Sequence, residues 1–283
     1  MNEEKGTILI LGGTGKTGRR VAERITARGL PVRIGSRSGQ PPFDWDDEAT
    51  WAPAVRGVAS VYVTYYPDLA FPGAADKVRA FAGVAVENGV RHLVLLSGRN
   101  EAGALLGEQA VRESGAEWTI VRSSFMNQNF DEGFWLDALL SGELAAPAGD
   151  VADPFIDADD IADVAAAALT EQGHAGQLYE VTGPRLLTFA DAVGEIAKAA
   201  GRDIRYVPVS SEQFLSGLIG EGVPADFATA LTDLFSEVLD GRSSYLSDGV
   251  KRALGREPKD FRDYAREAAA SGIWNTPAIA SSR

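Results

Sequence analysis

A cluster of glycines at residues 12–18 carries the strongest chemical signal in the sequence. Gly13, Gly15 and Gly18 fit the spacing G-x-G-x-x-G, and Gly12 begins the looser spacing G-x-x-G-x-x-G. Glycines allow a sharp turn, let a phosphate approach the backbone and let a helix pack closely, while the free amides of a helix start bind anions. The cluster therefore predicts a pyrophosphate site. Its expected contacts come from Gly12, Thr14, Gly15, Lys16, Thr17 and Gly18.

The same stretch imitates the phosphate-binding loop of ATP- and GTP-binding proteins, because Lys16 and Thr17 follow Gly15. That motif requires a glycine five positions before the one that precedes its lysine. Ile10 stands there instead, inside an apolar run. No later apolar run ends in an obvious magnesium-binding aspartate. We therefore expect a dinucleotide rather than ATP or GTP.

The loop after residues 31–34 bears on which dinucleotide binds. A fold that binds NAD usually carries an acidic residue here for the ribose hydroxyls. The sequence has Gly35, Ser36 and Arg37 instead, with no carboxylate. The guanidinium group of Arg37 is suited to a 2′-phosphate, and Lys16 is close enough in the glycine loop to assist. We expect NADP(H) in preference to NAD(H); the alternative is that Arg37 is simply an exposed loop residue.

Further candidates for the cofactor site lie where later apolar runs end. In an open parallel sheet, ligands bind at the carboxyl ends of the strands. Asp44 and Trp45 are expected to border the adenine, whereas Asp46 and Asp47 are expected to cap the next helix. The remaining expected cofactor contacts are Thr64, Tyr65, Ser97 and Gly98.

Aromatic and polar residues near these positions are candidates for substrate binding. Tyr66 follows Tyr65 directly, and Phe125 and Asn127 lie in a polar, aromatic segment after residues 118–122. Each has an equally good alternative as a core or capping residue. We expect Tyr66, Phe125 and Asn127 to contribute to an aromatic pocket beside the cofactor.

The elements that must position these residues alternate between strand and helix. Strand patterns cover residues 7–11, 31–34, 60–64, 91–98 and 118–122, with a short one ending near Phe43. Helical patterns separate them, and no hairpin signal interrupts the series. This order predicts an α/β fold of the Rossmann type, with right-handed βαβ units in a doubly wound parallel sheet.

The character of the sequence changes near residue 144. We expect an NAD(P)-binding Rossmann domain over residues 1–143, to which part of 151–183 returns through a strand at 177–181. Residues 144–283 are expected to form a smaller, mainly helical substrate domain, with a capped helix from Thr188 and a strand near 205–209.

Three aspartates in this second half invite a chemical interpretation. Asp157, Asp159 and Asp160 stand directly before an alanine-rich helix. Clustered carboxylates can act as acids, bases or metal ligands, but aspartates in this position more often cap the helix. We expect caps and no metal site.

The composition excludes several classes of function. The net charge of −13 would repel a nucleic-acid backbone or an anionic membrane. The absence of cysteine excludes disulfides, thiolate catalysis and cysteine–zinc sites, and His92 and His174 show no metal-binding spacing. We find no signal sequence and no membrane-spanning run. We expect a cytoplasmic protein whose partner is a small aromatic or quinone substrate, and a homodimer stays open as its assembly.

Taken together, these segments resemble the NmrA-like branch of the atypical short-chain dehydrogenase/reductase family. The matching segments cover most of the chain: ILGGTGKTGRRVAERI, VRIGSR, FDWDD, VRHLVLLSG, ESGAEWTIVRSSFMNQNF, FIDADDIADVAAAAL and LYEVTGPRLLTFADAV. The resemblance implies an extended Rossmann domain, a small C-terminal substrate domain and bound NADPH or NADH. Members of the family reduce quinones or dyes, act on aromatic natural products, or serve as redox-sensing regulators.

One departure from the wider superfamily bears on mechanism. Its usual catalytic pair is Tyr-x-x-x-Lys, in which the lysine lowers the pKa of a tyrosine that protonates the substrate. No tyrosine here has a lysine four positions later; Glu108 and Gln109 stand where the pair is expected, whereas Ser97 matches the family serine. The resemblance therefore implies hydride transfer to an acceptor that needs little acid catalysis, such as a quinone. Ser97, as a donor to an oxygen, and Tyr65 are the catalytic candidates.

Two alternatives stay open at this point. A regulator that senses NAD(P) would bind the nucleotide without turnover, and the missing tyrosine and lysine agree with that function. A tailoring enzyme for aromatic polyketides would couple cofactor oxidation to oxygen-linked hydroxylation of a reactive hydroquinone. A deep aromatic pocket beside the nicotinamide would count against the regulator.

Overall fold

The computed structural model describes residues 6–275, and the chain divides into two compact units. Unit 1 comprises the chain up to Ser124 together with Ala158–Thr182 and Ser247–Pro258. Unit 2 comprises Phe125–Asp157, Gly183–Leu246 and the chain from Lys259. The first crossing between units thus comes earlier than the boundary that the sequence suggests at residue 143, and a segment beyond residue 246 also belongs to unit 1.

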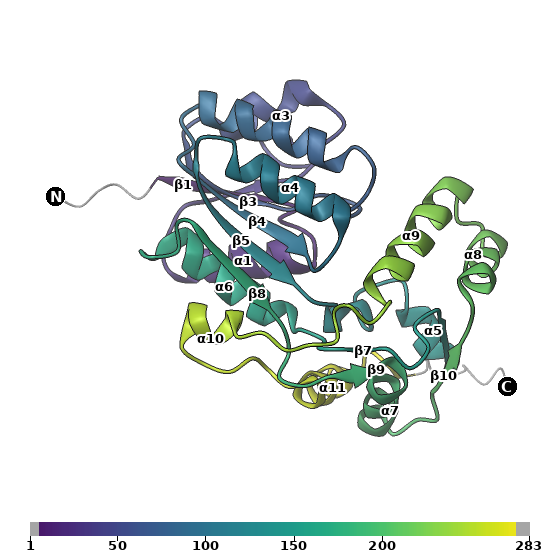
Figure 1. Ribbon diagram of the computed structural model, residues 1–283. Helices are drawn as coiled ribbons and strands as arrows, with labels where there is room; N and C mark the ends of the chain where they lie inside the picture. The colour runs from purple at the N-terminus through teal and green to yellow at the C-terminus, as the bar shows by residue number, and fades with distance from the viewer. Residues whose placement is uncertain (1–5, 276–283) are drawn as a thin grey trace, which may run out of the picture. The chain divides into compact units, whose positions relative to one another are not determined.

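A six-stranded parallel sheet forms the centre of unit 1 (Figure 1). Its strand order is β2-β1-β3-β4-β5-β8. The direction of winding changes between β1 and β3, the point at which doubly wound sheets bind their ligands. The predicted α/β fold of the Rossmann type is confirmed. The strands are β1 (Thr7–Leu11), β2 (Val32–Gly35), β3 (Val58–Val63), β4 (His92–Gly98), β5 (Glu117–Ser123) and β8 (Gln177–Val181).

Helices cover both faces of this sheet. Figure 1 shows α3 (Ala74–Glu87) and α4 (Ala102–Arg112) on one face, and α1 (Lys16–Ala27) and α6 (Ala158–Thr170) on the other. Because successive side chains of a strand point to opposite faces, alternate residues of each strand enter the two cores. The strand residues in the core that includes α3 and α4 are Leu9, Leu11, Val58, Val61, Val63, Leu93, Leu95 and Ile120.

The short strand expected near Phe43 is absent, so this prediction was wrong. The amide of Phe43 donates to the carbonyl of Ser36 at 2.9 Å, which folds the segment back on itself. Pro41 and Pro42 have no N–H group to offer a neighbouring strand. The described residues of this stretch form only an isolated bridge between Asp44 and Asp47, before a 3-10 turn (Glu48–Thr50) and α2 (Trp51–Val55).

Unit 2 is mainly helical and contains two small sheets. Its β6 (Glu143–Ala146) pairs in parallel with β10 (Arg205–Pro208), and β7 (Ala152–Asp153) pairs antiparallel with β9 (Leu187–Thr188). The helices are α5 (Leu136–Ser141), α7 (Phe189–Ala200), α8 (Ser211–Gly220), α9 (Ala225–Val238) and α11 (Phe261–Ala270), with a 3-10 turn at Asn127–Asn129.

Local sequence signals fix the start of α7. The hydroxyl of Thr188 accepts from the amide of Asp191 at 3.0 Å, and the Asp191 carboxylate accepts from the amide of Thr188 at 3.0 Å. This reciprocal pair satisfies two amides at the helix start that would otherwise lack partners. The capped helix predicted from Thr188 is confirmed.

The segment 247–258 contacts the rest of unit 1 closely at Gly249. It begins α10 (Gly249–Leu254), which packs against β8 and α6. A Cβ atom at residue 249 would lie 2.0 Å from the carbonyl oxygen of Glu180. We expect Gly249→Ala to lower the free energy of unfolding by about 1–3 kcal/mol, because the backbone must move to admit the methyl group.

Gly83 in α3 supplies the matched control, since nothing lies within 4 Å of its Cβ position. Gly83→Ala should raise the free energy of unfolding by about 0.5–1 kcal/mol, because alanine restricts the unfolded chain more than glycine does. Urea unfolding followed by circular dichroism measures both variants. A Gly249→Ala protein as stable as the wild type would contradict the close contact with β8.

Candidate cofactor-binding site

The glycine cluster forms the turn between β1 and α1. Gly12 has a φ of 59°, and the amide of Gly15 donates to the Gly12 carbonyl at 2.8 Å. Gly15 directly precedes α1, and no side chain caps this helix start. Thr14 and Gly15 are exposed, and the first turn of α1 holds no acidic residue. The positive end of the helix therefore meets an exposed turn, as an anion site requires.

The glycines of this turn have separable roles. Gly12 has the left-handed conformation that L side chains rarely adopt. A Cβ atom on Gly18 would lie 2.2 Å from the Gly12 carbonyl oxygen, so the close packing of α1 on the turn requires glycine there. Gly15 has an ordinary φ of −84°, and its nearest neighbour would lie 3.2 Å from an added Cβ. Residue 15 is therefore less tightly constrained by the fold than residue 18, and its missing side chain fits a phosphate that approaches the backbone.

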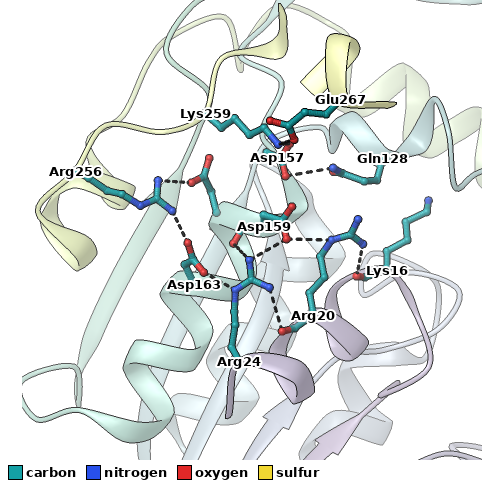
Figure 2. Close-up of polar contacts among 11 residues, drawn as sticks. Lys16, Arg20, Arg24, Gln128, Asp157, Asp159, Asp163, Arg256, Lys259 and Glu267 are labelled. Carbon is teal, nitrogen blue, oxygen red and sulfur yellow. Dashed lines mark hydrogen bonds and ion pairs between the residues drawn. The ribbon is translucent and has the colours of Figure 1, made fainter. Parts of the chain in front are cut away.

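A row of ion pairs along α1 and α6 holds the first turn of α1 (Figure 2). Arg20 donates to the carbonyl of Lys16 at 2.8 Å, and its Nε lies 3.3 Å from the carboxylate of Asp159. Asp159 also accepts from Arg24 at 2.8 Å, and Arg24 contacts Asp163 as well. The start of α1 is thus tied through its own arginines to the acidic start of α6.

The segment 247–258 extends the same row. Arg256 lies 2.5 Å from both Asp160 and Asp163 (Figure 2). Asp159 and Asp160 lie in the first turn of α6, where acidic side chains suit the helix dipole, and they bind arginines as well. Asp157 belongs to unit 2, where it is fully buried, accepts from Gln128 at 3.2 Å and lies 3.5 Å from the Nζ atom of Lys259.

Three predicted residues meet at the carboxyl end of β3. The Thr64 hydroxyl donates to the carbonyl of Leu11 at 3.2 Å, and the indole N–H of Trp45 donates to the carbonyl of Thr64 at 3.1 Å. Tyr65 packs on Trp45 with ring centres 5.0 Å apart. Trp45 is 9% exposed and also packs against Phe43, so it is mainly a core residue that supports this end of the sheet.

The loop after β2 places Arg37 in solvent. Its neighbours Ser36 and Ser38 have hydroxyl oxygens 3.4 Å apart. Asp44, next along the loop, accepts from the amide of Asp46 and offers its carbonyl to Trp51 at 2.7 Å. Asp44 is therefore a turn-forming residue in this structure, and no carboxylate stands at residues 36–38 to bind ribose hydroxyls.

The two predicted capping aspartates of this loop differ in role. Asp47 accepts from the amide of Ala49 at 3.1 Å at the start of the 3-10 turn, so the predicted cap is confirmed for this residue. Asp46 instead forms an ion pair with Lys77 of α3. The difference follows from the fold, because Lys77 comes from a helix that local sequence does not place beside the loop.

Ser97 and Gly98 end β4, and Ser97 is 3% exposed. The Ser97 hydroxyl donates to the carboxylate of Glu108 at 2.8 Å. Glu108 binds Arg122, and this carboxylate raises the pKa of the Arg122 guanidinium. This partner of Ser97 was not predicted from the sequence; the available signal was a glutamate placed among the buried residues of α4, such as Ala104 and Val111.

The predicted substrate residues fall in both units. Tyr66, in unit 1, is 80% exposed. Phe125, in unit 2, stacks on Trp135 with ring centres 5.4 Å apart. Asn127, also in unit 2, is fully buried, and neither its amide nitrogen nor its amide oxygen has a hydrogen-bond partner among the described residues. Tyr66 therefore lies in unit 1, whereas Phe125, which packs on the aromatic core of unit 2, and Asn127 lie in unit 2.

The opposite edge of the unit 1 sheet contains a hollow of about 620 Å³, lined by residues that include Arg91, His92 and Glu117. His92 shares a hydrogen bond of 2.9 Å with Thr119, whose hydroxyl donates to the carbonyl of His174. Burial lowers the pKa of His92. Both histidines thus have structural partners, and the hollow lies at the amino ends of the strands, away from the glycine turn.

Residues 6–275 contain no group of three histidine, cysteine, aspartate or glutamate side chains arranged to hold a metal ion. None of the helices in this range is long and apolar enough to cross a membrane.

Solved structures resemble this fold over nearly their whole length. The NADPH-dependent quinone oxidoreductase QOR2 of Escherichia coli, solved with NADPH, has a TM-score of 0.75 at 22% identity and covers 92% of this chain and 99% of its own. NmrA, a negative transcriptional regulator solved with NAD, has a TM-score of 0.71 at 17% identity and covers 96% and 99%. At such low identity, the likeness supports the fold alone.

Curated relatives are closer in sequence, although no protein-family model matches the chain. The chain is 32% identical over 285 residues to the uncharacterized oxidoreductase YesF of Bacillus subtilis, covering 96% of this chain and 98% of the relative. It is also 32% identical over 289 residues to the NAD(P)H azoreductase of Xenophilus azovorans, covering 93% and 98%. The chain belongs to the NmrA-like branch of the atypical short-chain dehydrogenase/reductase family. The predicted enzyme class, an oxidoreductase, is confirmed.

Because Gly15 and Gly18 have separate roles, substitutions at these two residues should have different effects. Gly15→Val should weaken NADPH binding by about 100-fold or more, because it blocks at least two hydrogen bonds to a charged group at about 1.5–3 kcal/mol each. Its free energy of unfolding should fall by only about 1 kcal/mol, the scale of a changed helix cap. Cofactor fluorescence titration and urea unfolding measure the two effects.

Gly18→Ala is the matched control for this prediction. The added methyl group meets the Gly12 backbone, so stability should fall by about 1–3 kcal/mol even without cofactor. If Gly15→Val bound NADPH as tightly as the wild type, phosphate would not approach the backbone at residue 15.

Proposed function

We propose that this protein is an NAD(P)H-dependent reductase that transfers hydride to a quinone-like or dye-like aromatic acceptor, with NADPH preferred over NADH. The observation that carries the proposal is the exposed glycine turn together with Glu108. This carboxylate is paired with Arg122 and stands where a catalytic tyrosine and lysine are usual in the superfamily. The names of the azoreductase and quinone oxidoreductase relatives support the acceptor class. We therefore propose neither regulation nor hydroxylation as a second function.

The residues of unit 1 fit a dinucleotide. The amides of the turn and of the first residues of α1 suit the pyrophosphate, with Thr14, Lys16 and Thr17 beside them. Arg37 suits the 2′-phosphate, because no carboxylate at residues 36–38 would repel it. Thr64, Tyr65, Ser97 and Gly98 follow β3 and β4 and are proposed to contact the rest of the cofactor. When bound, the reduced nicotinamide supplies the hydride.

The chain offers little acid catalysis to the acceptor. Glu108 is bound to Arg122, so a proton for the acceptor oxygen does not come from this carboxyl group. A quinone tolerates this lack, because the oxygen that gains charge becomes a delocalised phenolate that water can protonate. The remaining task of the residues is to hold the two reactants in a reactive geometry.

Tyr65 and Tyr66 are the proposed substrate contacts of unit 1, and Phe125 and Asn127 are the separate candidates of unit 2. Aromatic faces suit a planar acceptor. The Asn127 amide offers the strongest support within this set, because a buried donor and acceptor without partners are costly unless a ligand or water satisfies them.

Stopped-flow absorbance tests the reaction directly. NADPH bound to the wild-type protein is mixed with a panel of quinones and azo dyes, under nitrogen and under air. We expect rapid oxidation that depends on the acceptor and not on oxygen. Tight NADPH binding without oxidation by any acceptor would contradict a reductase and support a sensor. Oxidation that requires both the aromatic compound and oxygen would support hydroxylation.

Arg37→Ala tests the cofactor preference. We expect the Kd for NADPH to rise about 10-fold to 100-fold while the Kd for NADH stays unchanged, because one charge-assisted contact to the 2′-phosphate is worth about 1.5–3 kcal/mol. Arg56→Ala is the control, since Arg56 is also exposed but lies before the amino end of β3. Equal losses for NADPH and NADH in Arg37→Ala would exclude Arg37 as the 2′-phosphate contact.

A further inference from the structure

Strands β4, β5 and β8 carry a cluster of charged side chains near their carboxyl ends. Arg122 pairs with Ser97 in the β4–β5 register and with Glu180 in the β5–β8 register. Glu108 reaches this cluster from α4, and Ser97, Arg99 and Glu108 are each 3% exposed. Charged groups buried in this way must form hydrogen bonds with one another. The direction of each hydrogen bond then shows which group donates and which accepts.

The surroundings of Glu108 make it an acceptor. Arg122 donates from Nε to Oε1 at 2.7 Å and from Nη2 to Oε2 at 2.5 Å. This two-point arrangement is the geometry of a guanidinium group with an ionised carboxylate. A second guanidinium, that of Arg112, lies 3.8 Å from Oε2. Glu108 therefore has negative charge and no proton to give.

The hydroxyl of Ser97 must then be the donor in its contact with Glu108. The two oxygen atoms lie 2.8 Å apart, and only the serine brings a proton. The second carboxylate of the cluster, Glu180, accepts from Arg99 at 3.1 Å and lies 3.6 Å from Arg122, so it has partners of its own. Because its one proton points to Glu108, the Ser97 hydroxyl can bind a further partner only as a hydrogen-bond acceptor.

We propose that Glu108 is the positioning residue of Ser97, and that Ser97 meets the bound reactants as a hydrogen-bond acceptor. The inference rests on the proposed reductase function and reverses the donor role that the sequence suggests for Ser97. Its partner is an N–H or O–H group of the cofactor or of the substrate. Reduction of a quinone takes one hydride from the cofactor and one proton from water, and Ser97 neither gains nor loses a proton.

The place of the cluster favours this role over a purely structural one. Apolar contacts of Ala104, Ala110 and Val111 already hold α4 against the sheet. Buried ion pairs contribute little net stability compared with apolar residues of similar size. Ser97 also lies at the carboxyl end of a central strand, the edge at which open parallel sheets bind ligands.

Steady-state kinetics and NADPH titration test the proposal with three variants. They are Ser97→Ala, Ser97→Thr and the double variant Glu108→Met with Arg122→Met, called the apolar pair. Ser97→Ala should raise either the Kd for NADPH or the KM for a hydroxyl-bearing quinone by about fivefold to tenfold, the loss of one neutral hydrogen bond. The constant that rises identifies the reactant that carries the donor. Ser97→Thr should restore it, and the pH profile of kcat should not change.

The apolar pair should raise the same constant by a similar factor, and adding Ser97→Ala to it should cause no further loss, because Glu108 acts through the serine. Arg79→Met with Glu113→Met is the matched control. It removes an exposed pair with atoms 2.8 Å apart that links α3 to the residue after α4, and both constants should stay unchanged.

Nuclear magnetic resonance of the cofactor-free protein gives a readout independent of activity. We expect a slowly exchanging hydroxyl proton on Ser97 that disappears in the apolar pair and stays in the control pair. Absence of this proton from the wild type, additive losses in the combined variant, or a fall in kcat of about 100-fold or more with a changed pH profile in Ser97→Ala would overturn the proposal. Failure of the reductase function is distinct, because it shows as a wild-type protein that does not oxidise NADPH.

Discussion

The close approach of Gly18 to the Gly12 carbonyl sets the geometry on which the candidate site depends. Only hydrogen fits between α1 and the turn at this point, since a Cβ atom would come within 2.2 Å of the oxygen. The contact places the start of α1 directly after β1, between β2 and β3 in the sheet order. The free amides of that helix start then face the exposed turn, so one steric constraint inside the fold shapes the candidate anion site.

Ion pairs within the protein offset the charge of some arginines and leave others available to bind a ligand. The protein is acidic, with a net charge of −13, yet Arg20 and Arg24 beside the glycine turn are occupied by Asp159 and Asp163. They hold the turn in place and their charge is offset. Among the described residues, Arg37 has neither a hydrogen bond nor an ion pair from its guanidinium group, and this local contrast matters more for phosphate binding than the net charge of the chain.

Much of this arrangement follows from signals that are local in the sequence. The spacing of Gly12, Gly15 and Gly18, and the Thr188 to Asp191 cap, each involve residues a few positions apart, and both were predictable. The segment around Phe43 was not, because its amide turns back to Ser36 and its prolines prevent pairing. The contact between Glu108 and Arg122 joins a helix to a strand, so it depends on the register of β4 and β5, which periodicity does not specify.

The absence of a tyrosine and lysine pair, with Glu108 in its place and bound to Ser97, also bears on which acceptors suit the proposed site. A ketone becomes a strongly basic alkoxide on receiving hydride and needs an acid close at hand. The Glu108 carboxylate lies 2.8 Å from the Ser97 oxygen and is bound to Arg122, so it provides no acid. An acceptor that spreads its new charge over an aromatic ring needs no such acid. In the proposed reaction, the lack of an acid beside Ser97 would thus favour delocalised acceptors by making the reduction of a ketone costly, without any need for a contact that recognises them.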